Sequence, residues 1–275
     1  MHRVDVLDKG YVELVDSMGD QFRILEAARV STGSQVRKGN EKDRGLIRYL
    51  YFNKHTSPFE MVEFTFKMKM PIFVARQHIR HRTAGLNEKS GRYSVMDNEF
   101  YFPKLGRIQK QSTTNNQGSE DGFDKEIQYA VQGIVAEAAL DSEEAYEFML
   151  ERDVSRELAR IVLPLNTYTE MFWKIDLHNL LHYLSLRDHA HAQYEIREYA
   201  EAILAILNGM ENLEWVMEAF QDYRKAYTEF EKMLVRVRKE PNYVELLRMF
   251  GDFTSRYDYD EAFDIVHNRI GLGSL

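Results

Sequence analysis

The hydrophobic period of this chain changes at Pro71, and this change constrains the local fold more than any other feature. In residues 63–70 polar and apolar side chains alternate, the apolar ones being Phe64, Phe66, Met68 and Met70. Such alternation is typical of a half-buried strand. Pro71 suits the first position of a helix because its missing N–H would have no partner there. We therefore expect a strand followed directly by a helix that continues to Ile79.

The rest of the chain predicts further strands and helices. Asp20 is a candidate helix cap, because a short acidic side chain accepts hydrogen bonds from the free amides of the first turn. Residues 107–122 are polar, and we expect a mobile loop there. We divide the chain into a domain of residues 1–233 and a charged, tyrosine-rich helical extension of residues 234–275. The other expected elements are strands at 11–15, 93–102 and 166–174, and helices at 42–53, 123–151, 154–162, 177–186 and 190–207.

Residues 80–94, with the sequence RHRTAGLNEKSGRYS, follow the predicted helix and carry candidate chemistry. Three arginines and a glutamate occur in this segment together with serine and glycine. Guanidinium groups are planar forks of donors that match phosphate oxygens. An RHR triplet alone is most often a solvated helix end. The whole segment, however, suits a bound nucleotide better than a packed core.

The composition narrows the class of ligand. Acidic residues outnumber basic ones, 44 to 36, and an acidic chain lacks the basic face that coats DNA or RNA. We therefore expect a mononucleotide ligand and no nucleic acid polymer. The absence of cysteine excludes disulfides, thiolate metal sites and cysteine nucleophiles. No stretch approaches a membrane span or an apolar signal region, so we expect a cytoplasmic protein with no membrane partner.

A histidine-rich segment offers a competing interpretation. Its members are His178, His182, His189 and His191, with Asp188 and Glu195 nearby. Two histidines four residues apart on a helix, joined by a carboxylate, are able to bind zinc or iron. A metal-dependent hydrolase is therefore a second hypothesis. Histidine pairs are nevertheless common by chance, and core histidines bonded to backbone carbonyls are a simpler explanation.

Arg160 and Arg187 lie outside this segment, and the sequence around each of them does not by itself assign it a functional role. On the sequence alone, Arg160 is a helix-surface arginine whose stem covers apolar neighbours and is drawn partly inward. Arg187 is equally a salt-bridge partner of Asp188 or Glu195. Neither arginine is singled out by its own segment.

The segment at 80–94 resembles the signature of the flavin-dependent thymidylate synthases. The match runs through Arg80-His81-Arg82 and then through Asn87-Glu88-Lys89-Ser90-Gly91-Arg92-Tyr93-Ser94. Gly85 stands where the family most often has serine. Other landmarks follow in the family's order and extend the resemblance over about residues 5–205: AARVS at 27–31, HTSPFE at 55–60, FVARQHIRHR at 73–82, ARIVLPLNTYT at 159–169 and LRDHAHAQYEIREYA at 186–200.

The resemblance implies an α+β protomer with a central, mostly antiparallel sheet wrapped by helices. It implies a homotetramer whose active sites are shared between subunits. The implied reaction converts dUMP to dTMP, with 5,10-methylenetetrahydrofolate as carbon donor, FAD as cofactor and NADPH as reductant. A variant that acts on UMP, or that leaves a hydroxymethyl group, is also compatible with the sequence. So is a nucleotide-binding protein that has kept the fold without catalysis.

The resemblance also assigns roles to individual residues. Arg187 is the implied catalytic residue, which faces the uracil ring and favours its ionised N3 form. With this assignment the histidine pair binds flavin and we expect no metal. The implied FAD contacts are Ser57, Arg80, His81, Arg82, Glu88, Asp176, Leu177, His178 and His182. The implied dUMP contacts are Gln77, His78, Ile79, Arg80, Glu88, Lys89, Ser90, Gly91, Arg92, Arg160 and Arg187.

These residue types fit the implied chemistry. Uracil C5 is a poor nucleophile, and this chain has no thiol to add to C6. The Arg187 guanidinium is expected to stabilise negative charge on the ring, while the cofactor carries the redox step. Ser90 is an alternative nucleophile for C6, but a serine needs an adjacent base and the sequence identifies none. We therefore expect Ser90 and Arg92 to bind the phosphate or the sugar.

Overall fold

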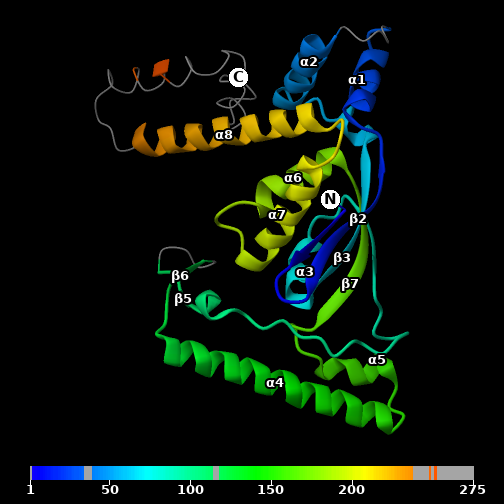
Figure 1. Ribbon diagram of the computed structural model, residues 1–275, viewed down its shortest axis with the longest axis vertical. Coiled ribbons are helices and arrows are strands. Elements are labelled where there is room, and N and C mark those ends of the chain that lie inside the picture. Colours follow the sequence, from blue (N-terminus) through cyan, green and yellow to red (C-terminus); the bar gives the residue numbers. More distant parts are fainter. Residues whose placement is uncertain (1, 34–38, 114–117, 238–247, 249–250, 253–275) are drawn as a thin grey trace, which may run out of the picture. The chain divides into compact units, whose positions relative to one another are not determined.

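The computed structural model describes residues 2–33, 39–113, 118–237, 248, 251 and 252. These residues belong to two compact units, both traced in Figure 1. Unit 1 comprises residues 1–18 and 63–209, and unit 2 comprises residues 19–62 and 210–275. Most of the expected extension at 234–275 lies outside the described residues, so the boundary at residue 233 stays a prediction.

A five-stranded antiparallel sheet forms the centre of unit 1 (Figure 1). In spatial order its strands are β1 (Arg3–Val6), β2 (Gly10–Met18), β3 (Glu63–Pro71), β7 (Tyr168–Asp176) and β4 (Gly85–Glu88). The alternating apolar side chains of β3 are buried and its polar ones are half-buried, which confirms the strand expected at 63–70. Phe66 pairs with Trp173 across β3 and β7, with ring centroids 6.2 Å apart. The expected central antiparallel sheet is therefore confirmed.

Helices cover the sheet and extend beyond it. They are α3 (Ile72–His78), α4 (Lys125–Glu151), α5 (Arg156–Ala159), α6 (Leu177–Arg187) and α7 (Tyr194–Asn208), with the 3₁₀ turns η2 (Leu105–Arg107) and η3 (Arg160–Val162). Helix α7 packs on β1 and β2, and α6 packs on β7 (Figure 1). The hydroxyl of Tyr199 on α7 donates a 2.7 Å hydrogen bond to the carbonyl of Lys69 on β3. In the described part of the chain, no helix has the length and apolar character needed to cross a membrane.

Unit 2 consists of α1 (Gln21–Val30), α2 (Asn40–Phe52), η1 (Phe59–Met61) and α8 (Glu214–Val237). The carboxylate of Asp20 accepts hydrogen bonds from two amides of the first turn of α1, which confirms the expected cap. Ion pairs between Arg44 and Glu218 and between Arg48 and Asp222 join α2 to α8. Helices α1 and α2 are linked by a buried ion pair, Arg29 with Asp43.

Three local expectations were wrong or incomplete. Residues 93–102 form no strand; a single bridge joins Phe100 to Thr167. Burial does not alternate here, because Tyr93 is 79% exposed whereas the adjacent Phe100 and Tyr101 are both buried. Residues 107–122 include a short antiparallel ribbon of β5 (Gln109–Gln111) and β6 (Ser119–Gly122). The helix expected at 154–162 is divided into α5 and η3.

Candidate functional site

The RHR triplet lies between α3 and the edge strand β4. Strand β4 pairs antiparallel with β7, from Gly85 opposite Lys174 to Glu88 opposite Met171. The hydroxyl of Thr169 on β7 donates a 2.8 Å hydrogen bond to the carboxylate of Glu88. Glu88 is thus held by the sheet while it remains exposed to a ligand. From the sequence this strand was expected to be part of a loop, because its four residues include a single apolar one, Leu86, and so show no alternation.

The loop after β4 turns tightly and brings Arg160 close. The hydroxyl of Ser90 accepts a 3.3 Å hydrogen bond from the amide of Arg92. Gly91 is buried, and a Cβ atom at this position would lie 3.2 Å from Cδ of Arg160. Glycine permits this close approach because it has no side chain. Arg160 itself is exposed rather than drawn inward, so its guanidinium is available beside the loop.

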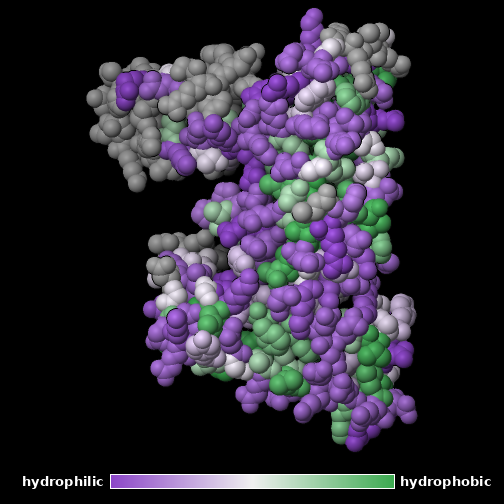
Figure 2. Space-filling model, in the orientation of Figure 1, coloured by the Kyte–Doolittle hydropathy of each residue, from purple (hydrophilic) through white to green (hydrophobic). Residues whose placement is uncertain are grey.

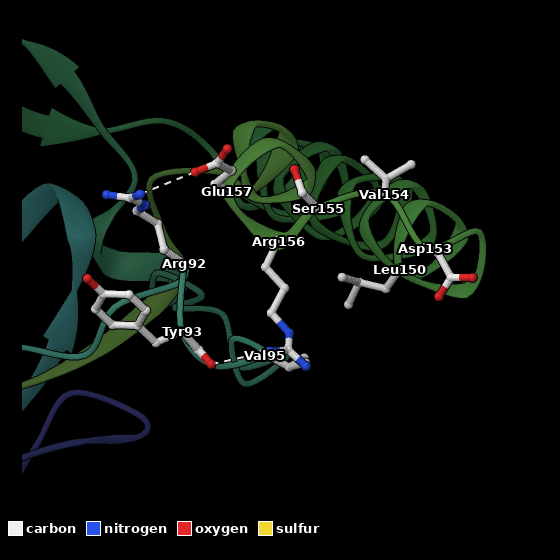
Figure 3. A pocket seen from close by; sticks show the side chains of 9 residues that line it. All are labelled: Arg92, Tyr93, Val95, Leu150, Asp153, Val154, Ser155, Arg156 and Glu157. Atoms are coloured by element: carbon white, nitrogen blue, oxygen red, sulfur yellow. Dashed lines mark hydrogen bonds and ion pairs between the residues drawn. The ribbon is translucent and has the colours of Figure 1, made fainter.

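A groove of about 630 Å³ runs between this loop and the turn from α4 to α5 (Figure 3). At its edge the guanidinium of Arg92 contacts the carboxylate of Glu157 at 3.3 Å, as the dashed line in Figure 3 shows. Arg156 donates to the backbone carbonyl of Tyr93 at 3.3 Å. Arg156 and Glu157 were not singled out from the sequence, where their only signal is the charge of the SRELAR segment; Tyr93 belongs to the family pattern at 87–94. The lining residues are Arg92, Tyr93, Val95, Leu150, Asp153, Val154, Ser155, Arg156 and Glu157.

Arg187, at the end of α6, is joined to the RHR triplet. Its Nε donates a 3.0 Å hydrogen bond to Nε2 of His81. Burial lowers the pKa of His81 to about 4, and the electrostatic effects of Arg187 and His182 act in the same direction. His81 is therefore neutral near pH 7, and its Nε2 is an acceptor. Of the two alternative salt-bridge partners of Arg187, Asp188 or Glu195, the Glu195 carboxylate is paired instead with Arg107 at 2.7 Å.

A buried aromatic cluster supports this pair. Nδ1 of His78 lies 3.2 Å from the hydroxyl of Tyr183, and the His78 ring is 4.3 Å from that of Trp173. The ring of His81 packs on Tyr183 at 4.8 Å. Burial lowers the pKa of His78 to about 3 and raises that of the Tyr183 phenol. The His78 side chain thus lies in the core behind His81, where it is 0% exposed.

The other two arginines of the loop present free charge. Arg80 and Arg82 are exposed, and neither guanidinium has a carboxylate partner among the residues that the structure describes. Ile79, between α3 and this turn, is also exposed. Neighbouring guanidiniums with unused donors match the oxygens of a diphosphate. This donor set therefore fits the FAD that the resemblance implies.

The remaining expected FAD contacts differ in exposure. Asp176 caps α6, where its carboxylate accepts from the amide and the side chain of Asn179. Leu177 is 0% exposed, so it supports the start of α6 from the core and offers no exposed atom to a ligand. The ring of the exposed His182 lies 6.4 Å from that of His81, and His178 is half-buried. Ser57 belongs to unit 2, in the turn before η1, and is exposed.

The histidine segment does not assemble the ligands that the hydrolase hypothesis needs. Among the described residues, no three His, Asp or Glu side chains are grouped so that they could hold a metal ion. The rings of His189 and His191 lie 5.0 Å apart, and the amide of His191 donates to Nδ1 of His189 at 3.2 Å. His182 instead lies beside His81.

Comparisons with known proteins agree with this geometry. The model of the thymidylate synthase complementing protein family matches residues 13–210. The chain is 48% identical to the flavin-dependent thymidylate synthase of Gluconobacter oxydans over 242 residues, covering 86% of this chain and 78% of that protein. It is 51% identical to that of Thermus thermophilus over 220 residues, covering 80% and 78%.

A solved structure agrees as well. The UMP/dUMP methylase PolB from Streptomyces cacaoi, bound with 5-Br dUMP, matches with a TM-score of 0.71 at 32% identity. The match covers 80% of this chain and 97% of that one. With the sheet, the loop and these relatives in agreement, the chain belongs to the flavin-dependent thymidylate synthase family.

Proposed function

We propose that the protein methylates dUMP at C5 to form dTMP, with 5,10-methylenetetrahydrofolate as carbon donor and NADPH-reduced FAD as hydride source. The observation that carries this proposal is the contact of Arg187 with a neutral His81 beside the arginine-rich loop. Membership of the flavin-dependent thymidylate synthase family supports it. The name of the structural neighbour, a UMP/dUMP methylase, supports a uridine nucleotide as substrate.

Arg187 is the proposed catalytic residue. A guanidinium held in place by His81 is preorganised to stabilise negative charge on the uracil ring at its N3/O2 edge, which makes C5 more nucleophilic. The neutral state of His81 leaves the positive charge of this pair on Arg187. The chain has no cysteine, so activation of C5 falls to this electrostatic effect.

The loop after β4 is the proposed dUMP-binding segment. Arg92 and Arg160 supply cations for the phosphate, and Gly91 allows the backbone to approach it. Ser90 acts as a ligand, because no histidine or carboxylate in the described residues contacts its hydroxyl to serve as a base. The full proposed set is Gln77, His78 as the buried residue behind His81, Ile79, Arg80, Glu88, Lys89, Ser90, Gly91, Arg92, Arg160 and Arg187.

The proposed FAD contacts come from the RHR turn, Glu88, the start of α6 and Ser57. Arg80 and Arg82 bind the diphosphate, and the half-buried His81 lies between them. His178 and His182 supply ring edges, and Ser57 supplies a hydroxyl. Asp176 and the buried Leu177 fix the start of α6 that carries the two histidines. When bound and reduced, FAD supplies the hydride that completes the methyl group.

A homotetramer with shared active sites is part of the proposal, and the long helix α4 supports it. Only Ala139 and Tyr146 of this helix are buried. Large apolar side chains on α4 are exposed: Ile127, Tyr129, Ile134, Leu140 and Phe148. Figure 2 shows apolar surface over the end of unit 1 that carries α4 and α5. Exposed apolar surface of this kind is typical of a subunit interface. A cytoplasmic location completes the proposal.

The absorption spectrum of the purified protein tests the reaction. NADPH is added under anaerobic conditions, followed by methylenetetrahydrofolate with dUMP or, in a parallel sample, with UMP. A flavin band that bleaches and returns, with dTMP as product, supports the proposal. A flavin band that bleaches without product supports a silent nucleotide-binding protein. A colourless protein that takes up no FAD and contains stoichiometric zinc or iron supports the hydrolase.

A further inference from the structure

The buried carboxylate of Glu195 lies at the start of α7 and anchors a chain of side chains that ends at Gln77. Glu195 is 3% exposed, and both of its oxygens are used. Arg107 donates to them at 2.7 and 3.3 Å, and the hydroxyl of Tyr101 donates at 3.2 Å. The fourth donor is Nε2 of Gln193, at 2.7 Å. The side-chain oxygen of Gln193 accepts in turn from Nε2 of Gln77.

The directions of these hydrogen bonds follow from the carboxylate. An ionised carboxylate only accepts hydrogen bonds, so Gln193 must turn its NH₂ group toward Glu195. Its oxygen then faces Gln77, which must turn its own NH₂ group toward Gln193. The Oε1 of Gln77 is left over, and no side chain or amide of the described residues donates to it. Gln77 is half-buried, on α3 just before the RHR turn.

We infer that Glu195 and Gln193 are positioning residues that fix the Gln77 amide with its oxygen toward the nucleotide. Gln77 then accepts a hydrogen bond from a donor on dUMP. Because Arg187 favours an ionised N3, which carries no hydrogen, this donor is the 3′-hydroxyl of the sugar. The inference rests on the proposed function, and it gives two residues of the HAHAQYE segment a role outside metal or flavin binding.

A single change reverses the chain of hydrogen bonds. In Glu195→Gln, the donors of Arg107 hold the new side-chain oxygen, so the new NH₂ group faces Gln193. The Gln193 amide turns over to offer its oxygen, and its NH₂ group then faces Gln77. Gln77 turns over in the same way and presents a donor to the nucleotide. The change is isosteric and keeps a hydrogen bond at each link from residue 195 to Gln77. It gives up the 3.3 Å bond from Nη2 of Arg107, which shares Oε2 with Gln193, whereas the 2.7 Å bond from Nε of Arg107 to the other oxygen remains.

The test measures the dissociation constant of dUMP for the FAD-loaded protein. Variants are Glu195→Gln, Gln77→Leu and the double variant, with Glu201→Gln as a matched carboxylate-to-amide control at a more exposed position of α7. We expect Glu195→Gln and Gln77→Leu each to raise the dissociation constant of dUMP about five- to tenfold. The double variant is expected to be no weaker than Gln77→Leu alone, and the control to bind normally. If Glu195→Gln does not fold, Gln193→Leu breaks the same chain and replaces it.

Analogues identify the donor. We expect 2′,3′-dideoxy-UMP, which lacks the 3′-hydroxyl, to bind Gln77→Leu and the unmodified protein equally. N3-methyl-dUMP keeps that hydroxyl, so Gln77→Leu should weaken its binding as it weakens the binding of dUMP. Three results overturn the inference. The first is additive losses of dUMP affinity in the double variant, and the second is normal dUMP affinity of Gln77→Leu. The third is that Gln77→Leu weakens the binding of 2′,3′-dideoxy-UMP but not that of N3-methyl-dUMP. Formation of dTMP by the unmodified protein is scored separately, so failure of the proposed function is distinguishable from failure of this one.

Discussion

Nε of Arg187 and Nε2 of His81 are 3.0 Å apart, which joins the end of α6 to the turn after α3. This contact leaves the planar end of the guanidinium free to act on a substrate. We expect Arg187→Ala to abolish formation of dTMP while FAD remains bound, because the charge on the uracil ring loses its stabilising partner. Turnover and the flavin spectrum are measured on the same sample. Near-normal turnover contradicts the assignment.

Acid is expected to destabilise the fold through His78. Its ordinary pKa of 6.5 falls to about 3 in the folded protein because the ring is buried. Between these two values the unfolded chain binds the extra proton, so the free energy of unfolding decreases as the pH falls from 6.5 toward 3, by up to about 1.4 kcal/mol per pH unit. Above pH 6.5 this contribution is fully present. Urea unfolding between pH 7 and pH 4.5 measures the dependence.

The matched variants for this titration are His78→Gln and His189→Gln. His78→Gln removes the more strongly shifted ring and is expected to reduce the slope, whatever its stability at pH 7. The part due to His81, whose pKa is lowered to about 4, remains. His189 is exposed, so His189→Gln is expected to keep the original slope. Equal slopes in all three proteins show that His78 does not carry the effect.

Arg92 is expected to recognise the phosphate. Its guanidinium is exposed and reaches Glu157 at 3.3 Å, so a phosphate only has to compete with a solvated partner. Arg92→Ala should raise the dissociation constant of dUMP about 10- to 100-fold, since a charge-assisted hydrogen bond is lost. Binding of deoxyuridine, which has no phosphate, is the control and should be unchanged. A comparable loss with deoxyuridine shows that Arg92 acts on another part of the ligand.

Ser90→Ala is expected to retain measurable activity. The serine hydroxyl accepts from the amide of Arg92 and has no base beside it among the described residues, so it contributes a hydrogen bond and not a nucleophile. We expect kcat to fall by about tenfold at most. Complete loss of dTMP formation with unchanged dUMP and FAD binding revives the nucleophile hypothesis.

Gly85→Ser is expected to be tolerated. A Cβ atom at Gly85 would be 3.8 Å from its nearest neighbour, Cβ of Lys174, which is an ordinary contact. Removing a glycine from a strand should stabilise the protein by about 0.5–1 kcal/mol. Thermal unfolding and turnover measure both effects. A fall in stability, or a large loss of turnover, shows that the small side chain at this position is needed.

The sequence predicted helices and strands well where the spacing of apolar residues stayed constant over the whole element. The strand at 63–70 and the long helix at 123–151 were confirmed within two residues at each end, because alternation and helical spacing report directly which side chains are buried. Strand β4 was missed because it is four residues long, and all four are exposed. Its formation depends on β7, which follows about eighty residues later along the chain.

The sequence predicted which segment carries the ligand-binding residues, but not which distant residues these side chains contact. The residue types at 80–94 indicate anion binding by themselves, and the family pattern names the same segment. The contact of Arg187 with His81 joins residues more than a hundred positions apart, and no local pattern encodes it. Glu195 appeared in the sequence as a possible metal ligand or salt-bridge partner, whereas its neighbours in space are Arg107, Tyr101 and Gln193.

The edge position of β4 has a consequence for how the protein can vary. Within the part of the chain that the structure describes, this strand pairs only with β7 and buries none of its side chains, so the aromatic core does not depend on it. Substitutions in the segment it carries can alter ligand recognition at little cost to global stability, since local opening at an edge leaves the interior intact. The architecture therefore separates the evolution of substrate preference from the evolution of stability.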